Sequence, residues 1–306
     1  MSTAVESEMM FCASCGTAGS DDIKLKNCTA CYLVRYCGVK CQKEHRPKHK
    51  RECKKRAAEL KDEILFKQPE STHLGDCSIC CLPLPLDPEK YCLNSCCSKI
   101  ICQGCNCANI QREHVGRLQH ICPFCRKSMP NDEEINRRLM KRIEANDPVA
   151  MCHFGTERCK IRDYEAAFEY WTKAVSLGDV EAHYRLSLLY HNGDGIEKDK
   201  KKEFHHLTEA AIKGHPLARH NIGCFEAVHN DRHDRAAKHW IIAANLGHDD
   251  SLVSLKKAYK AGFASKEDFT TALRGHKAAI DATKSPQREE AAKLMMQAAD
   301  RERRGV

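Results

Sequence analysis

The sequence between residues 28 and 41 reads CTACYLVRYCGVKC and places four cysteines in one short segment. The first two, Cys28 and Cys31, are separated by two residues, a spacing that lets both sulfurs reach one tetrahedral zinc ion at about 2.3 Å. Four more pairs share this spacing, and they begin at Cys12, Cys77, Cys102 and Cys122. A single pair is weak evidence because redox motifs share it, whereas five pairs predict a recognition region folded by zinc.

The composition favours an intracellular chain of several domains. The 306 residues leave room for two or three domains, and 30% charged with 42% hydrophobic residues is typical of globular proteins. No run approaches the roughly 18 apolar residues of a membrane span, and the first residues lack the features of a secretory signal. We therefore expect reduced thiols, which favour metal over disulfides, and a cytoplasmic or nuclear location without membrane contact.

The positive charge is concentrated near the N-terminus. Residues 1–56 carry 12 Lys/Arg against 6 Asp/Glu, with most of the excess between Lys40 and Arg56. Such a cluster attracts nucleic acid or an acidic protein, or it forms a solvated helix face that offsets zinc-bound thiolates. The stretch lacks the interleaved aromatics on which single-strand binders stack bases, so nucleic acid is the less favoured partner.

The first cysteine-rich segment supplies eight ligands for two tetrahedral ions. They are Cys12, Cys15, Cys28, Cys31, Cys37, Cys41, His49 and Cys53. So short a segment cannot bury much apolar core, so metal must provide most of its folding free energy. The spacing of four residues within each of the last two ligand pairs allows each pair to share a helix face.

The stretch Tyr36-Cys37-Gly38-Val39-Lys40-Cys41-Gln42, followed by His49 and Cys53, resembles the MYND-type zinc finger. Ligand pairs interleave in that family, which implies one zinc ion on Cys12, Cys15, Cys37 and Cys41 and a second on Cys28, Cys31, His49 and Cys53. His45 stands where the family usually has a tryptophan, and we expect it to be an exposed or packing side chain. The family binds short, often proline-rich peptides, so the resemblance implies peptide ligands on partner proteins.

A second cysteine-rich segment follows a charged helix and a linker. It contains Cys77-Ser78-Ile79-Cys80, then Cys96-Cys97-Ser98-Lys99-Ile100-Ile101-Cys102-Gln103-Gly104-Cys105, and it closes with Cys122-Pro123-Phe124-Cys125-Arg126. These residues resemble a RING-type zinc finger, a cross-braced domain with two zinc ions. The resemblance implies that Cys77, Cys80, Cys102 and Cys105 hold one ion. It implies that Cys122 and Cys125 hold the other, with two ligands from the middle of the segment.

The identity of those two middle ligands stays open. Lys99 occupies the family's histidine position, and a protonated lysine cannot ligate zinc. Adjacent Cys96 and Cys97 are the favoured couple. The alternatives are Cys92, Cys107 and His120, and we expect Cys81 to be a packing thiol. With two ions in each module, we expect four zinc ions in the chain.

RING-type fingers of ubiquitin ligases position a ubiquitin-conjugating enzyme and its thioester-linked ubiquitin, and they do no covalent chemistry themselves. Their docking surface uses an apolar residue in the first knuckle, a proline in the last and a cation just after the final ligand. Ile79, Pro123 and Arg126 stand at these positions. The guanidinium of an arginine suits such a bridge because it offers several donors in a fixed fork. The alternative is that the first two residues are ordinary knuckle packing and the third is a surface charge.

The remainder of the chain repeats with a period near 35 residues. Leu177-Gly178-Asp179, Lys213-Gly214-His215 and Leu246-Gly247-His248 recur at intervals of 36 and 33 residues. This period indicates stacked helical hairpins, each of which buries its face against the next. Glycine in each turn suits a left-handed helix end, and Pro216 suits a first helical position.

The unit from 182 to 196, with its Asn192-Gly193-Asp194-Gly195 turn, resembles Sel1-like repeats, which are relatives of the tetratricopeptide family. The resemblance implies a solenoid whose concave surface binds a protein. Ser265 to Asp268 predicts a helix N-cap. A final helix over 287–303 is expected to pack on, or fray from, the open end of the repeats. The histidines of this region show no fixed spacing, so we expect them to be repeat-face residues rather than metal ligands.

The sequence therefore predicts a multidomain, mainly α chain, in which two small cross-braced zinc-binding α+β modules precede a solenoid of α/α-hairpins. The expected boundaries are a disordered N-terminus over 1–11, a MYND-type finger over 12–53, a helix and linker over 54–76, a RING-type finger over 77–126, Sel1-like repeats over 131–284, and a C-terminal helix and tail over 285–306.

Three functional hypotheses follow. The leading one is a RING-type ubiquitin ligase whose other modules select substrates. The alternative is a non-catalytic adaptor in which all three modules bind proteins. A weaker alternative is a nucleic-acid-associated regulator that uses residues 40–56. No side-chain arrangement in the sequence points to catalysis by the side chains themselves.

Overall fold

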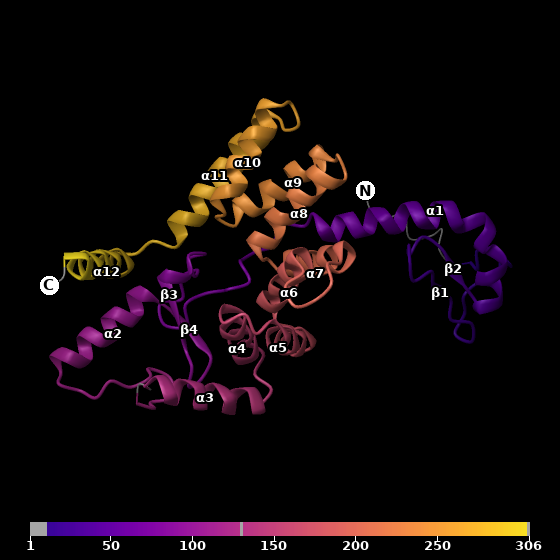
Figure 1. Ribbon diagram of the computed structural model, residues 1–306. Helices are drawn as coiled ribbons and strands as arrows, with labels where there is room; N and C mark the ends of the chain where they lie inside the picture. The colour runs from indigo at the N-terminus through magenta and orange to yellow at the C-terminus, as the bar shows by residue number, and fades with distance from the viewer. Residues whose placement is uncertain (1–10, 129–130, 305–306) are drawn as a thin grey trace. The chain divides into compact units, whose positions relative to one another are not determined.

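The computed structural model describes residues 11–128 and 131–304, and it separates into two compact units that meet between Lys67 and Gln68 (Figure 1). The expected disordered N-terminus falls almost entirely on residues outside this description, as does the very end of the expected tail. Within the described ranges the chain is mainly helical, with twelve α-helices and two small antiparallel sheets, as the sequence predicts. None of these helices is both long and apolar enough to cross a membrane.

The first unit is a short hairpin beside one long helix. Strands β1 (Lys26–Asn27) and β2 (Arg35–Tyr36) pair antiparallel, and helix α1 runs from Val39 to Leu65. The core of this unit consists of Tyr36 together with Cys12, Cys28 and Cys31. Pro47 lies inside α1, where it cannot donate a hydrogen bond to the carbonyl of Lys43, and Figure 1 shows the helix changing direction along its length.

The second unit begins with the second cysteine-rich segment. A 3-10 turn, η2 (Pro88–Lys90), leads into β3 (Tyr91–Asn94), which pairs antiparallel with β4 (Lys99–Cys102), and α2 (Gln103–Val115) follows directly. Leu84 and Ile101 are buried between the cysteines. We call residues 76–128 the second cysteine module and residues 11–53 the first.

The rest of the second unit is the repeat array. Its helices are α3 (Asp132–Glu144), α4 (Pro148–Lys160), α5 (Tyr164–Ser176), α6 (Val180–Asn192), α7 (Lys200–Ile212), α8 (Pro216–His229), α9 (His233–Asn245), α10 (Asp249–Lys260) and α11 (Lys266–Ala282). Consecutive helices from α4 to α11 pack as antiparallel hairpins, and each hairpin packs against the next. The period near 35 residues was therefore interpreted correctly as stacked hairpins.

The turns between repeats take the backbone conformation that the sequence predicts. Gly178, Gly214 and Gly247 have φ values of +91°, +84° and +88°, a region that glycine enters at no steric cost. Each helix after such a turn is capped, and two caps are unexpected. The ring nitrogen Nδ1 of His215 accepts a hydrogen bond from the amide of Ala218, and His248 does the same for Ser251. These two histidines therefore cap α8 and α10, which corrects their interpretation as repeat-face residues.

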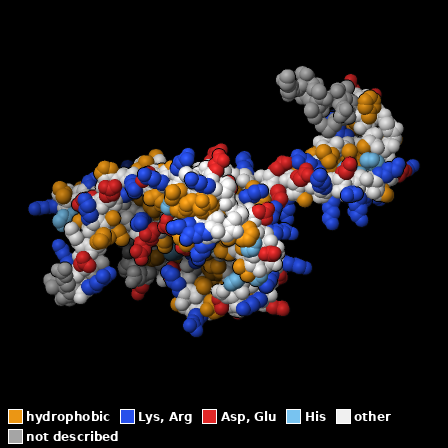
Figure 2. Space-filling view, turned by 90° about the horizontal axis from the view of Figure 1, so that it is seen from above, with side chains coloured by type: hydrophobic (Ala, Val, Ile, Leu, Met, Phe, Trp, Pro, Cys, Tyr) orange, Lys and Arg blue, Asp and Glu red, His pale blue; other side chains and the backbone are white. Residues whose placement is uncertain are grey.

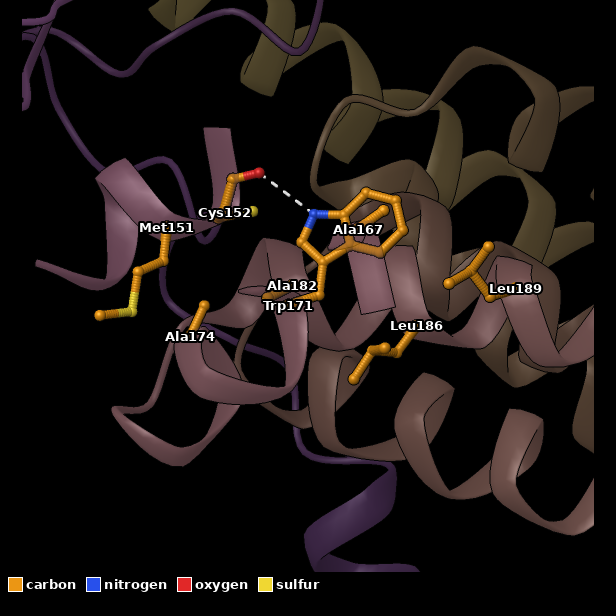
Figure 3. Packing of buried hydrophobic residues seen from close by; sticks show 8 residues of the cluster. All are labelled: Met151, Cys152, Ala167, Trp171, Ala174, Ala182, Leu186 and Leu189. Carbon is orange, nitrogen blue, oxygen red and sulfur yellow. Dashed lines mark hydrogen bonds between the residues drawn. The ribbon is translucent and has the colours of Figure 1, made fainter. Parts of the chain in front are cut away.

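A tryptophan and a glycine meet inside the first hairpin. The indole Nε1 of Trp171 donates to the carbonyl of Cys152 over 3.1 Å, and the ring lies between α4 and α6 in the core that Figure 3 shows. A Cβ added at Gly155 would lie 2.8 Å from this ring. The same pairing recurs between Gly223 and Trp240, where the distance would be 2.6 Å. These glycines let neighbouring helices approach across an indole.

The final helix lies where the sequence did not predict it. Helix α12 (Pro286–Arg304) packs against α2 of the second cysteine module rather than on the open end of the repeats (Figure 1). Gly104 permits the approach, because a Cβ at this position would lie 2.9 Å from the backbone nitrogen of Arg288. The guanidinium of Arg288 then donates to the carbonyls of Leu82 and Pro83. These partly buried carbonyls give α12 a polar anchor on the second cysteine module, which explains its position.

Candidate metal centres

The first module brings its eight predicted ligands into two groups of four. One group is Cys12, Cys15, Cys37 and Cys41, and the other is Cys28, Cys31, His49 and Cys53. In each group the ligand atoms lie within 4.8 Å of one another. The grouping follows the interleaved order that the resemblance implies, with first and third pairs together and second and fourth together.

The distances inside these groups suit a zinc ion. A tetrahedron with sulfurs at about 2.3 Å from its centre has edges of about 3.8 Å. The sulfurs of Cys15 and Cys37 lie 3.6 Å apart, and those of Cys28 and Cys53 lie 3.7 Å apart. The Nε2 atom of His49 lies 3.2 Å from the sulfur of Cys31. The donor set of thiols and imidazole therefore fits the ion in both chemistry and spacing.

A recurring backbone turn positions four of the five cysteine pairs. In each, the residue after the second cysteine donates its amide to the carbonyl of the first, as Gly16 does to Cys12 over 2.9 Å. This residue has a positive φ in all four turns, at Gly16, Tyr32, Cys81 and Arg126. The turn aims both thiols to one side. The fifth pair, Cys102 and Cys105, instead uses the start of α2, where the amide of Cys105 donates to the sulfur of Cys102.

The same turns favour thiolates. Burial raises the pKa of Cys12, but hydrogen bonds from the backbone amides of Cys15, Cys37 and Ser14 outweigh it and lower the pKa to about 6. Hydrogen bonds likewise outweigh burial at Cys28, where backbone amides and the His49 side chain contribute, and at Cys77, and the pKa of both is about 6. Because only the deprotonated sulfur binds zinc, these donors prepare Cys12, Cys28 and Cys77 for metal.

His45 has a packing role rather than a ligand role. Its Nδ1 lies 3.1 Å from the hydroxyl of Tyr36, and its ring stacks on His49 with centroids 5.7 Å apart. His45, which stands where the MYND family usually has a tryptophan, therefore packs against the candidate ligand His49. This agrees with its interpretation as an exposed or packing side chain.

The second module also brings eight cysteines into two groups. They are Cys77, Cys80, Cys102 and Cys105 in one group, and Cys96, Cys97, Cys122 and Cys125 in the other. The sulfurs of Cys80 and Cys102 lie 3.8 Å apart, and so do those of Cys97 and Cys122. Adjacent Cys96 and Cys97 thus join one group because the turn between β3 and β4 carries both toward the last knuckle.

The alternatives for the middle ligands lie elsewhere. His120 interacts through its Nδ1 with the buried carboxylate of Glu113, which also accepts a hydrogen bond from the amide of Ile121. Cys92 lies on β3, and Cys107 lies on α2. Cys81 is exposed rather than packed, which corrects its expected role as a packing thiol. None of these four residues belongs to a metal-type group in the described part of the chain.

Two of the three predicted contact residues share a groove. Ile79 and Pro123 line a depression of about 410 Å³ together with Ala108 and Asn109 of α2. Ile79 is 43% exposed. Arg126 is exposed but does not line this groove, whereas Gln287 of α12 does. The knuckles of the second module therefore form one surface with α2, and the final helix borders it.

One further group of metal-type side chains is held together by hydrogen bonds. Glu181 accepts from Nε2 of His73 over 3.2 Å and from Nε2 of His215 over 3.0 Å, and the two rings stack with centroids 4.1 Å apart. Because Nδ1 of His215 accepts the amide of Ala218, the neutral ring carries its proton on Nε2. That nitrogen has no lone pair for a cation, so we interpret the group as a clamp between the linker and the repeats.

Sequence reasoning missed this clamp and Arg288. The partners of His73 lie more than one hundred residues away, and no local pattern marks them. The Nη2 atom of Arg288 lies 3.3 Å from the sulfur of Cys80. It is a charged neighbour of a candidate zinc ligand, and nothing in the run of polar residues around position 288 signals it.

Comparison with known families identifies two of the three regions. Residues 12–53 match the MYND finger, and residues 150–179, 180–215 and 230–248 match the Sel1 repeat. The chain thus contains a MYND finger, a zinc-binding module, together with Sel1 repeats. Both belong to protein-interaction architectures. The second cysteine module has no such match among these families, and its four-cysteine groups are compatible with zinc.

Individual relatives are distant. A segment of 76 residues is 34% identical to the rat protein "DAP3-binding cell death enhancer 1" and 30% identical to its mouse counterpart. It covers 25% of this chain and only 15% of either relative. A Sel1 repeat protein from Oxalobacter formigenes is 18% identical, covering 63% of this chain and 86% of its own, with a TM-score of 0.44. A protective antigen from uropathogenic Escherichia coli is 17% identical, covering 55% and 38%, with a TM-score of 0.43.

Proposed function

We propose that this chain is a zinc-dependent adaptor that binds different proteins through its MYND finger and its repeats. The observation that carries the proposal is the presence of both modules in one chain, because each is a protein-binding type. The repeats also offer an apolar depression of about 350 Å³, lined by Leu188 of α6 and by Phe225 and Val228 of α8. Val228 is 75% exposed, which suits a contact with a partner.

The adaptor role predicts that the two surfaces act independently. Partners are captured with the full chain, with Val228→Asp, and with Cys31→Ser, which removes a candidate ligand of the finger. We expect the two variants to lose different partners. The matched control is Val253→Asp, an exposed valine of α10 outside the depression. Identical partner sets for both variants and the wild type would contradict the proposal.

We propose that the two cysteine modules bind four zinc ions, two in each. The spacing of sulfurs and the backbone turns described above support this stoichiometry, because the donor sets are of the kind found in closed structural sites. Zinc bound there would contribute folding free energy. With four protein ligands, it would have no open coordination position for a substrate. Elemental analysis of the purified chain is expected to give four zinc ions, and a count of two would restrict the metal to one module.

The rat relative is named for binding DAP3. We propose that the matched segment of this chain also binds a protein, whose identity the partner capture would supply. The segment covers only a small share of that relative. The relative's name therefore suggests protein binding as the type of activity, and it does not identify a partner of this chain.

A second candidate function is ubiquitin ligation by the second module, the hypothesis that led the sequence analysis. The specific observation in its favour is the groove shared by Ile79 and Pro123 beside α2. The test is auto-ubiquitylation of the full chain with a panel of conjugating enzymes. We expect Ile79→Ala to abolish transfer. Ile110→Ala is the matched control, because Ile110 is equally exposed and lies on α2 outside the groove.

Arg126→Ala tests the bridging cation separately. Arg126 is exposed near the groove but not part of its lining, so loss of transfer without loss of conjugating-enzyme binding would indicate contact with ubiquitin. Absence of transfer with every enzyme in the panel would leave the second module as a binding element of the adaptor.

A further inference from the structure

A groove of about 530 Å³ runs along α1 in the first module. Its apolar part comes from Ala30, Tyr36, Val39 and Ala57. Tyr36 is buried, but Val39 is 66% exposed, so part of this apolar surface faces solvent. An exposed apolar strip between a zinc knuckle and a helix suits an inserted side chain from another molecule.

All of the charged side chains that line the groove and form its rim are basic. Lys43, Arg46, Lys50 and Lys54 line it, and no acidic residue does. They are spaced three or four residues apart, which places them on one face of the helix. All four are exposed, and Figure 2 shows Lys and Arg side chains gathered beside hydrophobic ones on this part of the molecule.

These four cations have no anionic partner in the part of the chain that the structure describes. By contrast, Lys55 and Arg56 pair with Glu59, and Arg56 also pairs with Glu63. Like charges four residues apart destabilise a helix. The sequence thus concentrates unpaired positive charge on the groove while neutralising it further along the same helix.

We propose that this groove binds an acidic peptide segment of a partner, with one apolar side chain on the strip and carboxylates on the basic rim. The inference rests on the proposed protein-binding role of the MYND finger and adds the charge of the segment that it binds. From Lys43 to Lys54 the rim covers 11 helical steps, about 16 Å, which matches about five residues of extended peptide. Nucleic acid fits less well, because the only aromatic rings lining the groove are those of Tyr36 and His49, and both are buried.

The test measures fluorescence anisotropy with the full chain and three labelled probes. The first is a decapeptide with four carboxylates around a central leucine, the second is its amide isostere, and the third is a single-stranded oligonucleotide of equal charge. We expect only the acidic peptide to bind well, with an affinity that falls as salt rises. Equal binding of the amide isostere, or preferential binding of the oligonucleotide, would overturn the inference.

Paired variants locate the contact. Arg46→Glu with Lys50→Glu should weaken acidic-peptide binding about tenfold or more, since two favourable pairs become repulsive. Lys48→Glu with Arg51→Glu makes the same charge change on α1 outside the groove, and we expect an effect below about threefold. Equal effects of the two pairs would contradict a groove-specific site. The same residues are also changed to glutamine, and a zinc count of each variant checks that the finger stays folded.

The inference and the adaptor proposal can fail separately. If no acidic peptide binds but partners still depend on Cys31, the finger binds a ligand of another charge and only the inference fails. If the acidic peptide binds and no cellular partner depends on the finger, the adaptor proposal fails while the groove assignment stands.

Discussion

The guanidinium of Arg288 lies against the sulfur of Cys80, with Nη2 to Sγ at 3.3 Å, although 208 residues separate them in the chain. The same guanidinium donates to the carbonyls of Leu82 and Pro83 and to that of Thr283. A cation at this position would reduce the mutual repulsion of thiolates in this group of four cysteines. Arg288 thus couples the final helix to the first knuckle of the second module.

Replacement of Arg288 should loosen that knuckle. Arg288→Ala removes three hydrogen bonds to Cys80, Leu82 and Pro83, and we expect a loss of about 1–3 kcal/mol in the stability of the second module. Faster hydrogen exchange over residues 77–86 and faster zinc release to a chelator are the measurements. Lys293→Ala, which changes an exposed lysine of α12 paired with Glu290, should leave both unchanged. Unaltered exchange in Arg288→Ala would show that the contact does not stabilise the knuckle.

A methyl group at Gly223 should destabilise the repeats. It would lie 2.6 Å from the indole nitrogen of Trp240, so the helix pair must separate or the ring must leave its rotamer. Overpacking of this kind costs about 1–3 kcal/mol, which exceeds the intrinsic helix preference of alanine over glycine of about 1 kcal/mol. Chemical unfolding measures the change. Lys256→Ala, an exposed site in α10, is the control, and a stabilised Gly223→Ala would refute the packing argument.

Acid should weaken the repeats well above the pH at which carboxylates titrate. Burial lowers the pKa of His215 to about 4, and that of His183 falls to about 4 for the same reason. Their unfolded pKa is about 6.5, so the unfolded chain binds more protons between these values. Stability is therefore complete above pH 6.5 and is lost as the pH falls toward 4.

The measurement follows tryptophan fluorescence in urea at pH 7, 6 and 5. Both tryptophans of the chain, Trp171 and Trp240, lie in the repeats, so the signal reports the repeats alone. His215→Asn keeps a side chain that can cap α8 and removes one titrating ring, so its stability should depend less on pH. His229→Asn, at an exposed position, should retain the wild-type slope. Equal slopes for both variants would exclude His215 as a source of the acid sensitivity.

Zinc counting separates the candidate ligands of the second module. Cys96→Ser should reduce the content by one ion, because its sulfur belongs to a group of four with Cys97, Cys122 and Cys125. Cys92→Ser should retain the full content, since Cys92 lies outside every such group in the described chain. Loss of zinc from Cys92→Ser alone would reverse the assignment.

Local features of the sequence predicted the fold well. The paired cysteines and the glycines of the repeat turns act through the backbone within five residues, so spacing alone indicates their geometry. Ser265 also caps α11 with a reciprocal hydrogen bond to Asp268, as its motif predicts. The choice of Cys96 and Cys97 could not be made from spacing, because it depends on how the turn after β3 meets the last knuckle.

Contacts between the repeats could have been predicted from their period, whereas contacts that involve the rest of the chain could not. The positions of Gly155 and Gly223 differ by 68 residues and those of Trp171 and Trp240 by 69, so the glycine–indole pairing follows the repeat and could have been found from it. The docking of α12 on α2 could not, since it depends on the fit of one arginine between two carbonyls and a thiol. The clamp of His73 on Glu181 depends likewise on the path of the linker.

The docking of α12 has a consequence for synthesis. The ribosome releases the second cysteine module about 160 residues before it releases Pro286, and chains fold from the N-terminus as they emerge. The knuckle around Cys80 is therefore expected to lack its contact with Arg288 for as long as the repeats are being made. A chain truncated before residue 288 lacks this contact permanently, and we expect its second module to be less stable for that reason.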